Sequence, residues 1–190
     1  MAATPKGCAV IRLGPFAGMV LGVLAIGGSA AAHTTPWLIW NASASVPIGL
    51  YLIEPAVHLE VTDLVVANPP QAIARFLDER GYLPIGVPLL KRVVAFPGQT
   101  ICRTGATIAV GGVAMGAALA RDHLGRAMPV WRGCRVLGDG EAFLMNWQVP
   151  DSVDGRYFGP FPLTSIIGRA IPLWTDEDGN GRFEWLAPTR

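Results

Sequence analysis

One uncharged apolar segment, residues 14–32, divides the chain into parts that must fold separately. It carries no charged side chain, and Ser29 is its only strongly polar residue. Its length matches the ~20 apolar residues that a helix needs to cross a lipid bilayer. Lys6 and Arg12 precede it, and basic residues are enriched on the cytoplasmic side of such segments. We therefore expect a single-pass helix with a cytoplasmic N-terminus.

This interpretation predicts three regions: a cytoplasmic N-terminus at 1–13, a transmembrane anchor at 14–32 and an exported domain at 33–190. A cleaved signal peptide is the alternative, because the small residues 30–32 resemble a processing site. We favour the anchor because the apolar span is longer than a usual signal-peptide core. Both interpretations export the rest of the chain.

The exported part reads as a mainly β domain. The whole chain has 16 prolines and 23 glycines, and most of them lie in this part, where they separate short β-type runs and argue against a helical bundle. Gly111 and Gly112 mark a two-residue hairpin turn. One helix is expected, at 71–80, between two prolines and a glycine. The expected strands are 49–53, 62–67, 90–96, 107–110, 113–115, 141–146, 165–174 and 182–186. The fold class expected is a coiled antiparallel β-sheet domain.

Charge and cysteine content exclude several functions. A net charge of +1 with 15% charged residues offers no basic patch for nucleic acid. Cys102 and Cys134 lack the paired spacing of a zinc site, and the acidic run at 176–181 lacks the ligand spacing of a calcium loop. We expect neither a metal nor another cofactor. Two cysteines in an exported domain instead predict a Cys102–Cys134 disulfide.

Lys91 is the only lysine of the exported part, where every other basic residue besides histidine is arginine. It lies in the apolar run 89–96, where a surface cation would be out of place. Arginine stays protonated in proteins, whereas a desolvated lysine can lose its proton and act as a general base. We interpret Lys91 as a catalytic lysine.

Two further motifs supply partners for such a base. Ser43 and Ser45 precede a proline at the start of an expected strand, and a serine hydroxyl becomes a good nucleophile only when a base takes its proton. Ser152 could orient the lysine amine, while Asp154 and Arg156 could pair and brace the site. Each motif alone has an ordinary structural explanation, and their combination is what points to catalysis.

The three motifs, in this order behind an apolar N-terminal segment, resemble the type I signal peptidase family, the Ser-Lys peptidases of the bacterial inner membrane. The resemblance is greatest to its conjugative-transfer branch, the TraF-like peptidases that mature plasmid pilin precursors. It implies Ser45 as nucleophile, Lys91 as general base, and Ser43 with the backbone N–H of Ser45 as oxyanion hole. It also implies that Ser152 hydrogen-bonds the lysine and that Asp154 and Arg156 form a structural ion pair.

The chain departs from general signal peptidases in ways that fit the specialised branch. Ser45 and Pro47 are separated by one residue fewer, which leaves Ser43 open as an alternative nucleophile. Gln99 replaces an aspartate, and the motif before the last box is reduced to the sequence at 144–147.

The resemblance implies a periplasmic serine endopeptidase acting on a membrane-inserted, pilin-like precursor, with conjugation machinery as a further possible partner. Two alternatives stay open: a general signal peptidase, and a non-catalytic assembly component of a conjugation apparatus.

Overall fold

A computed structural model describes the backbone of residues 13–31 and 37–188, and the side chains of 16–28 and 37–188. The chain divides into two compact units, Met1–Thr35 and Pro36–Arg190. In the first unit, helix α1 (Leu13–Ala31) covers most of the apolar segment. Among the residues described, no helix combines the length and hydropathy required for a membrane crossing. The anchor at 14–32 therefore stays a prediction.

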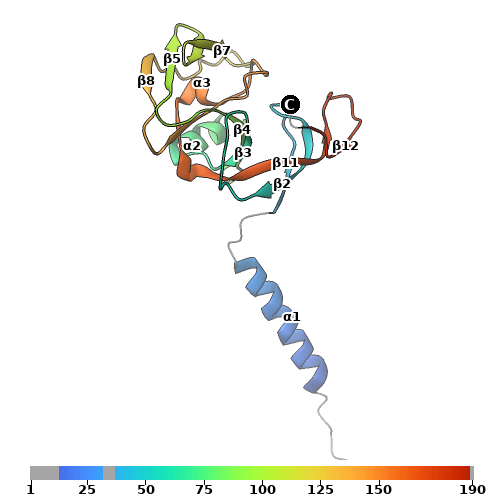
Figure 1. The fold of residues 1–190 in the computed structure, drawn as a ribbon. Helices are drawn as coiled ribbons and strands as arrows, with labels where there is room; N and C mark the ends of the chain where they lie inside the picture. The colour runs from blue at the N-terminus through green and yellow to red at the C-terminus, as the bar shows by residue number, and fades with distance from the viewer. Residues whose placement is uncertain (1–12, 32–36, 189–190) are drawn as a thin grey trace, which may run out of the picture. The chain divides into compact units, whose positions relative to one another are not determined.

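The second unit is mainly β, as expected, with two antiparallel sheets (Figure 1). The larger sheet has eight strands, in the order β1-β2-β11-β3-β4-β9-β10, with β12 paired to β11. Its strands are β1 (Leu38–Asn41), β2 (Ile48–Glu54), β3 (Leu64–Ala67), β4 (Leu89–Ala95), β9 (Glu141–Leu144), β10 (Phe161–Pro162), β11 (Ile166–Asp176) and β12 (Glu184–Trp185).

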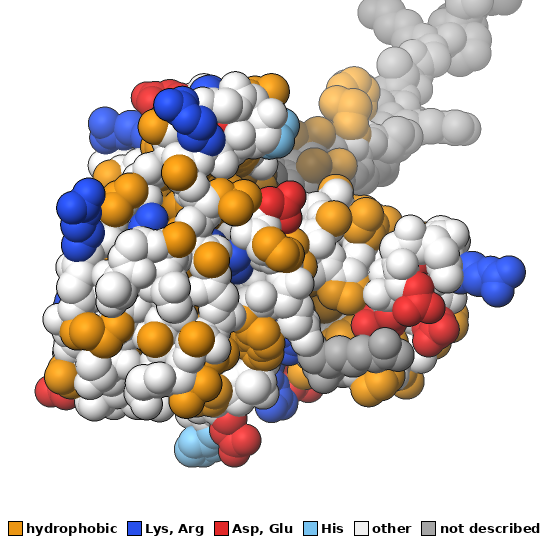
Figure 2. Space-filling view, turned by 90° about the horizontal axis from the view of Figure 1, so that it is seen from above, with side chains coloured by type: hydrophobic (Ala, Val, Ile, Leu, Met, Phe, Trp, Pro, Cys, Tyr) orange, Lys and Arg blue, Asp and Glu red, His pale blue; other side chains and the backbone are white. Residues whose placement is uncertain are grey.

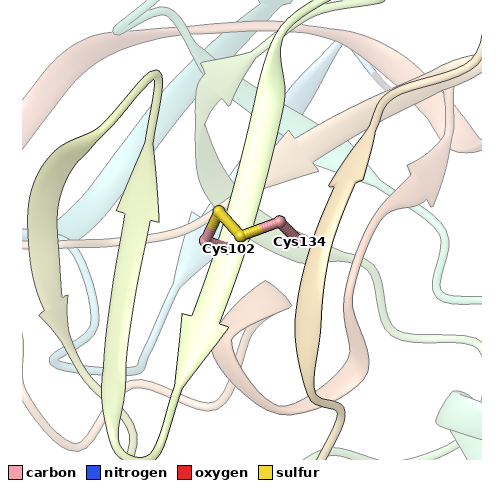
Figure 3. Close-up of a disulfide and its surroundings, with 2 residues drawn as sticks. All are labelled: Cys102 and Cys134. Atoms are coloured by element: carbon pink, nitrogen blue, oxygen red, sulfur yellow. A yellow bond between two sulfur atoms is a disulfide. The ribbon is translucent and has the colours of Figure 1, made fainter.

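The smaller sheet has the order β7-β6-β5-β8 and carries the disulfide. Its strands are β5 (Thr100–Thr104), β6 (Thr107–Val110), β7 (Val113–Ala117) and β8 (Gly133–Val136). Gly111 and Gly112 connect β6 to β7 with φ of 56° and 83°, the left-handed values that a tight hairpin requires. Figure 3 shows Cys102 on β5 bonded to Cys134 on β8, at opposite positions of one antiparallel pair.

Three short helices complete the unit: α2 (Gln71–Glu79), α3 (Gly155–Phe158) and the 3-10 turn η1 (Leu163–Ser165). Helix α2 follows Pro70 and ends before Gly81, whose φ of 70° suits a glycine better than other residues. Its apolar side chains Ile73, Phe76 and Leu77 recur at helical spacing and pack into the core beside the larger sheet.

Strand β4 is the centre of the unit, because all seven of its residues are buried. Its side chains contribute to three hydrophobic clusters: Val94 to one, Val93 to the next and Leu90 to the third. A strand covered on both faces provides an apolar environment for any polar side chain within it. Lys91 is such a side chain.

The expected strands correspond to observed ones with shifts of a few residues at their ends, and the last shrinks to Glu184–Trp185. Four strands were not expected: β1, β5, β8 and β10. The reasons are physical. Arg103 interrupts the apolar alternation of β5, and β8 is an edge strand with all four residues exposed. Strand β10 has only two residues, and one is a proline.

Candidate active site

Lys91 is 3% exposed and its Nζ donates a hydrogen bond of 2.8 Å to the hydroxyl of Ser152. Burial lowers the pKa of Lys91 from 10.5 to about 8. The negative charge of Asp154 opposes this effect, and the positive charge of Arg156 adds to it. The amine is therefore much closer to neutrality at physiological pH than an exposed lysine would be.

Ser43 and Ser45 lie on the connection between β1 and β2, where their hydroxyl oxygens are 3.1 Å apart. The Ser43 hydroxyl also donates to Oδ1 of Asn41, at 2.9 Å. Ser43 is exposed and Ser45 is partly exposed, so an approaching polypeptide can reach both. No hydrogen bond joins Lys91 to Ser45 among residues 37–188.

The two serines, Lys91 and Ser152 nevertheless line one pocket of about 650 Å³. Much of its remaining wall is apolar and comes from the end of α2 and the segment that follows it. These wall residues are Leu77, Tyr82, Leu83, Gly86, Val87, Pro88, Leu89 and Leu90. Part of the segment at 71–90 thus forms a wall of the pocket that Ser45 and Lys91 line.

A second pocket, of about 350 Å³, meets the first at Ser45. Its lining includes charged and polar side chains, among them Arg92, Gln148 and the acidic turn at 176–178. That turn connects β11 to β12, and its Asp176 carboxylate accepts from the backbone N–H groups of Asn180 and Gly181. No group of metal-ligating side chains forms within the described part of the chain. Ser45 thus lines both pockets.

Asp154 and Arg156 form a fully buried ion pair, with Nε to Oδ1 at 2.8 Å and Nη2 to Oδ2 at 3.1 Å. The arginine also donates to the carbonyl oxygens of Asn146 and Pro150, each at 2.7 Å. Every buried side-chain polar atom of the described residues has a hydrogen-bond partner. A buried pair needs such saturation, because desolvation of its charges otherwise exceeds their attraction.

Three residues of the site were not singled out from the sequence. Asn41 donates to the carbonyls of Ser43, Val46 and Pro47, and so shapes the connection that bears both serines. Tyr51 donates to the same Pro47 carbonyl at 2.7 Å. Asn146 donates to the carbonyl of Ser45 at 2.8 Å.

The sequence held a faint signal for the two asparagines. Asn41 ends an apolar run directly before the serine motif, and asparagine there favours a side-chain-to-backbone turn. Asn146 closes the apolar run of β9. In each case a polar residue directly after an apolar run is the signal, but spacing alone could not indicate which backbone groups it contacts.

Comparison with known proteins identifies the family of the chain. The sequence model of the family described as "Signal peptidase, peptidase S26" matches residues 10–174. A conjugal transfer protein TraF from Agrobacterium fabrum is 34% identical over 179 residues, covering 88% of this chain and 96% of the relative. A plasmid transfer protein TraF from Escherichia coli is 36% identical over 146 residues, with coverage of 71% and 81%.

Among solved structures, a signal peptidase I from Enterococcus faecalis matches at 19% identity and a TM-score of 0.36, covering 59% of this chain and 96% of that one. The extent of the family match and the identity to the two TraF proteins agree with the resemblance carried by the serine and lysine motifs. The chain belongs to the signal peptidase family, peptidase S26.

Proposed function

We propose that this protein is a membrane-anchored serine endopeptidase that cleaves an exported, membrane-inserted precursor with a Ser45–Lys91 dyad. The observation that carries the proposal is the buried Lys91, which is bonded to Ser152 in a pocket that also contains Ser45. A lysine with a pKa of about 8 is a competent general base, because the best catalytic pKa lies near the working pH.

In the proposed reaction, neutral Lys91 takes the proton of Ser45 as its hydroxyl attacks the scissile carbonyl. The resulting oxyanion accepts hydrogen bonds from the backbone N–H of Ser45 and the hydroxyl of Ser43. Protonated Lys91 then donates to the departing amine. Water, or an amine of the substrate itself, resolves the acyl-enzyme to give a linear or a cyclic product.

The resting geometry defines two rearrangements that this reaction needs. Ser43 donates to Asn41 in the free protein, so its hydroxyl must turn toward the oxyanion when substrate binds. Lys91 bonds Ser152, so the Ser45 hydroxyl must leave Ser43 and approach the amine. Catalytic hydrogen bonds commonly tighten only in the substrate complex.

The two pockets support cleavage inside a chain rather than at its end. An endopeptidase must hold residues on both sides of the scissile bond, and Ser45 lines two pockets. Exposed apolar side chains include Trp40, which lines the larger pocket, as well as Trp37 and Ile85. Figure 2 shows hydrophobic side chains interspersed with polar ones over much of one face. Apolar groups at the pocket entrance suit a substrate and an enzyme that both lie at the periplasmic surface of an inner membrane.

A substrate in conjugative transfer is the narrower part of the proposal. Its support is the identity to proteins named for conjugal and plasmid transfer. A pilin-like precursor is the exported, membrane-inserted substrate that the TraF-like branch implies.

The test is the mass of a neighbouring pilin-like precursor co-expressed with the full chain, Ser45→Ala, Lys91→Arg or Lys91→Met. We expect a shortened product with the wild type only, and a further loss of one water if the product is cyclic. Lys91→Arg is the sharpest variant, because arginine keeps the charge but cannot accept the proton. Cleavage by Lys91→Arg would rule out the lysine as base.

Two other outcomes separate the alternatives. An intact precursor with every variant, including the wild type, supports a non-catalytic assembly component. Growth rescue of a strain depleted of its own signal peptidase would instead support a general signal peptidase.

A further inference from the structure

Asn146 occupies a position between the nucleophile and the base that the proposed mechanism has not used. It is 3% exposed, lies just after β9 and, among the described residues, makes no hydrogen bond with either reacting side chain. Its side-chain amide instead contacts only backbone groups, and these belong to the residues on which catalysis depends.

Toward the general base, the Asn146 side chain forms hydrogen bonds with the backbone of β4 at both neighbours of Lys91. Its Oδ1 accepts from the N–H of Arg92 at 3.0 Å, and its Nδ2 donates to the carbonyl of Leu90 at 3.2 Å. Two bonds to one short backbone segment fix both the position and the orientation of the amide.

On the nucleophile side, the second N–H of the same amide donates to the carbonyl of Ser45 at 2.8 Å. Over residues 37–188, this is the only hydrogen bond that joins residues 42–47 to a residue beyond 41–51. Strands β2 and β4 are not sheet neighbours, because β11 and β3 lie between them. Val46 and Leu90 belong to one hydrophobic cluster, but no direct sheet ladder joins β2 to β4.

The asparagine is itself held in place by the buried ion pair. Its N–H donates to Oδ2 of Asp154 at 3.0 Å, and its carbonyl accepts from Nη2 of Arg156 at 2.7 Å. The pair therefore fixes the backbone of Asn146, whose side chain in turn fixes the carbonyl of Ser45 relative to β4.

We propose that Asn146 is a positioning residue that sets the register between Ser45 and Lys91. The inference rests on the proposed function, since it assigns a role within the same dyad. This role explains why the Asp154–Arg156 ion pair lies beside the site. The ion pair holds the backbone of Asn146, and the side-chain amide of Asn146 holds the carbonyl of Ser45. Misplacement of a reacting group by about 1 Å can cost ~100-fold in rate.

The experiment is a double-mutant cycle on the full chain in detergent, with Asn146→Ala, Lys91→Met and the combined variant. The readout is the rate of Ser45 acylation by p-nitrophenyl acetate at pH 9, followed by intact mass, with Ser45→Ala as the baseline. This small ester needs neither pocket, so it reports the reactivity of the dyad alone.

We expect Asn146→Ala to slow acylation roughly 10- to 100-fold when Lys91 is present, and less than about 3-fold when Lys91 is Met. Equal losses in both backgrounds would overturn the positioning role, because a general structural defect does not depend on the base. An unchanged rate in Asn146→Ala would overturn it as well.

Tyr157→Phe is the matched control. The buried Tyr157 hydroxyl accepts from the backbone N–H of Leu119 at 3.1 Å, so its loss also leaves a backbone group without its partner, away from both serines. Acylation by this variant should match the wild type. If Asn146→Ala does not fold, Asn146→Asp keeps the acceptor for Arg92 and removes both N–H donors, and the same cycle applies.

The same measurements test the proposed function separately from the role of Asn146. If the wild type is acylated no faster than Ser45→Ala, the proposed Ser-Lys peptidase is refuted, and the positioning role of Asn146 is refuted with it. Lys91-dependent acylation with no effect of Asn146 would refute the positioning role alone.

Discussion

At the scale of single residues, the protein places one cation where it is least favourable. Lys91 is 3% exposed in a strand that is buried throughout, and its pKa is lowered from 10.5 to about 8, chiefly by desolvation. A lowered lysine pKa means that the folded state holds this proton less tightly than the unfolded chain does. The shift corresponds to about 3 kcal/mol, which opposes folding while both states are protonated.

Lys91→Met should therefore stabilise the protein at pH 7, by about 1–3 kcal/mol once the lost partner of Ser152 is allowed for. The sign depends on pH. Below pH 8 both states of the wild type carry the proton and the full cost applies. Between pH 8 and 10.5 the folded state has released it while the unfolded chain keeps it, so wild-type stability rises and the advantage of Met shrinks.

Urea unfolding of both proteins at pH 7 and pH 10 measures this difference. Ser152→Ala in each background controls for the lost hydrogen bond. A Met variant that is less stable than the wild type at pH 7 would show that desolvation of Lys91 is not the dominant effect, and the inferred basicity of the site would be wrong.

At the scale of elements, the site depends on the close approach of α3 to β9. A Cβ built on Gly155 would lie 2.6 Å from the carbonyl oxygen of Leu144 and 2.9 Å from the ring of Phe143. Because backbone cannot yield as a side-chain end can, only glycine fits between Asp154 and Arg156. Gly155, between Asp154 and Arg156, is thus a packing requirement.

Gly155→Ala should lower the free energy of unfolding by about 1–3 kcal/mol, the usual cost of overpacking a core. It should also lower activity, because the shift displaces the ion pair that holds Asn146. Gly140→Ala is the control, since nothing lies within 4 Å of its Cβ and it is exposed. The comparison uses the thermal unfolding and the acylation rate of the two variants. If Gly155→Ala and Gly140→Ala have the same stability and the same rate, Gly155 does not support the site.

The elements also show which parts of the fold the sequence could predict. Gly111 and Gly112, and the apolar spacing of α2, carry local information, and both elements lie where the sequence placed them. Strands β5 and β8 lack such local information, because they form by pairing with residues distant in the sequence. Cys102 of β5 lies opposite Cys134 of β8.

The residues of the site also divide into those that the sequence could predict and those that it could not. Lys91, Ser45 and Ser152 were predicted by their chemical type in unusual surroundings. Asn41 and Asn146 act through backbone carbonyls, which have no sequence signature. Their roles become visible only when residues about 100 positions apart, such as Ser45 and Asn146, lie side by side.

At the scale of the whole molecule, the two sheets contribute differently. The larger sheet and its loops provide both pockets around Ser45, whereas neither Cys102 nor Cys134 lines either of these two pockets. The disulfide closes a loop of 32 residues and pairs two strands of the smaller sheet. Its effect should therefore fall on stability rather than on chemistry.

The double variant Cys102→Ala/Cys134→Ala should lose about 3–4 kcal/mol of unfolding free energy, because the unfolded chain regains the entropy of an unclosed loop of this length. Its acylation rate should stay within about 2-fold of the wild type under conditions where both are folded. The measurements are urea unfolding and p-nitrophenyl acetate acylation, with Val113→Ala, an exposed position of the same sheet, as a control for mutation of that sheet. An unchanged stability would indicate that the purified wild type carries two free thiols, which thiol labelling of the denatured, unreduced chain detects directly. Such thiols would also remove one argument for an oxidising compartment, because disulfides persist where proteins are exported.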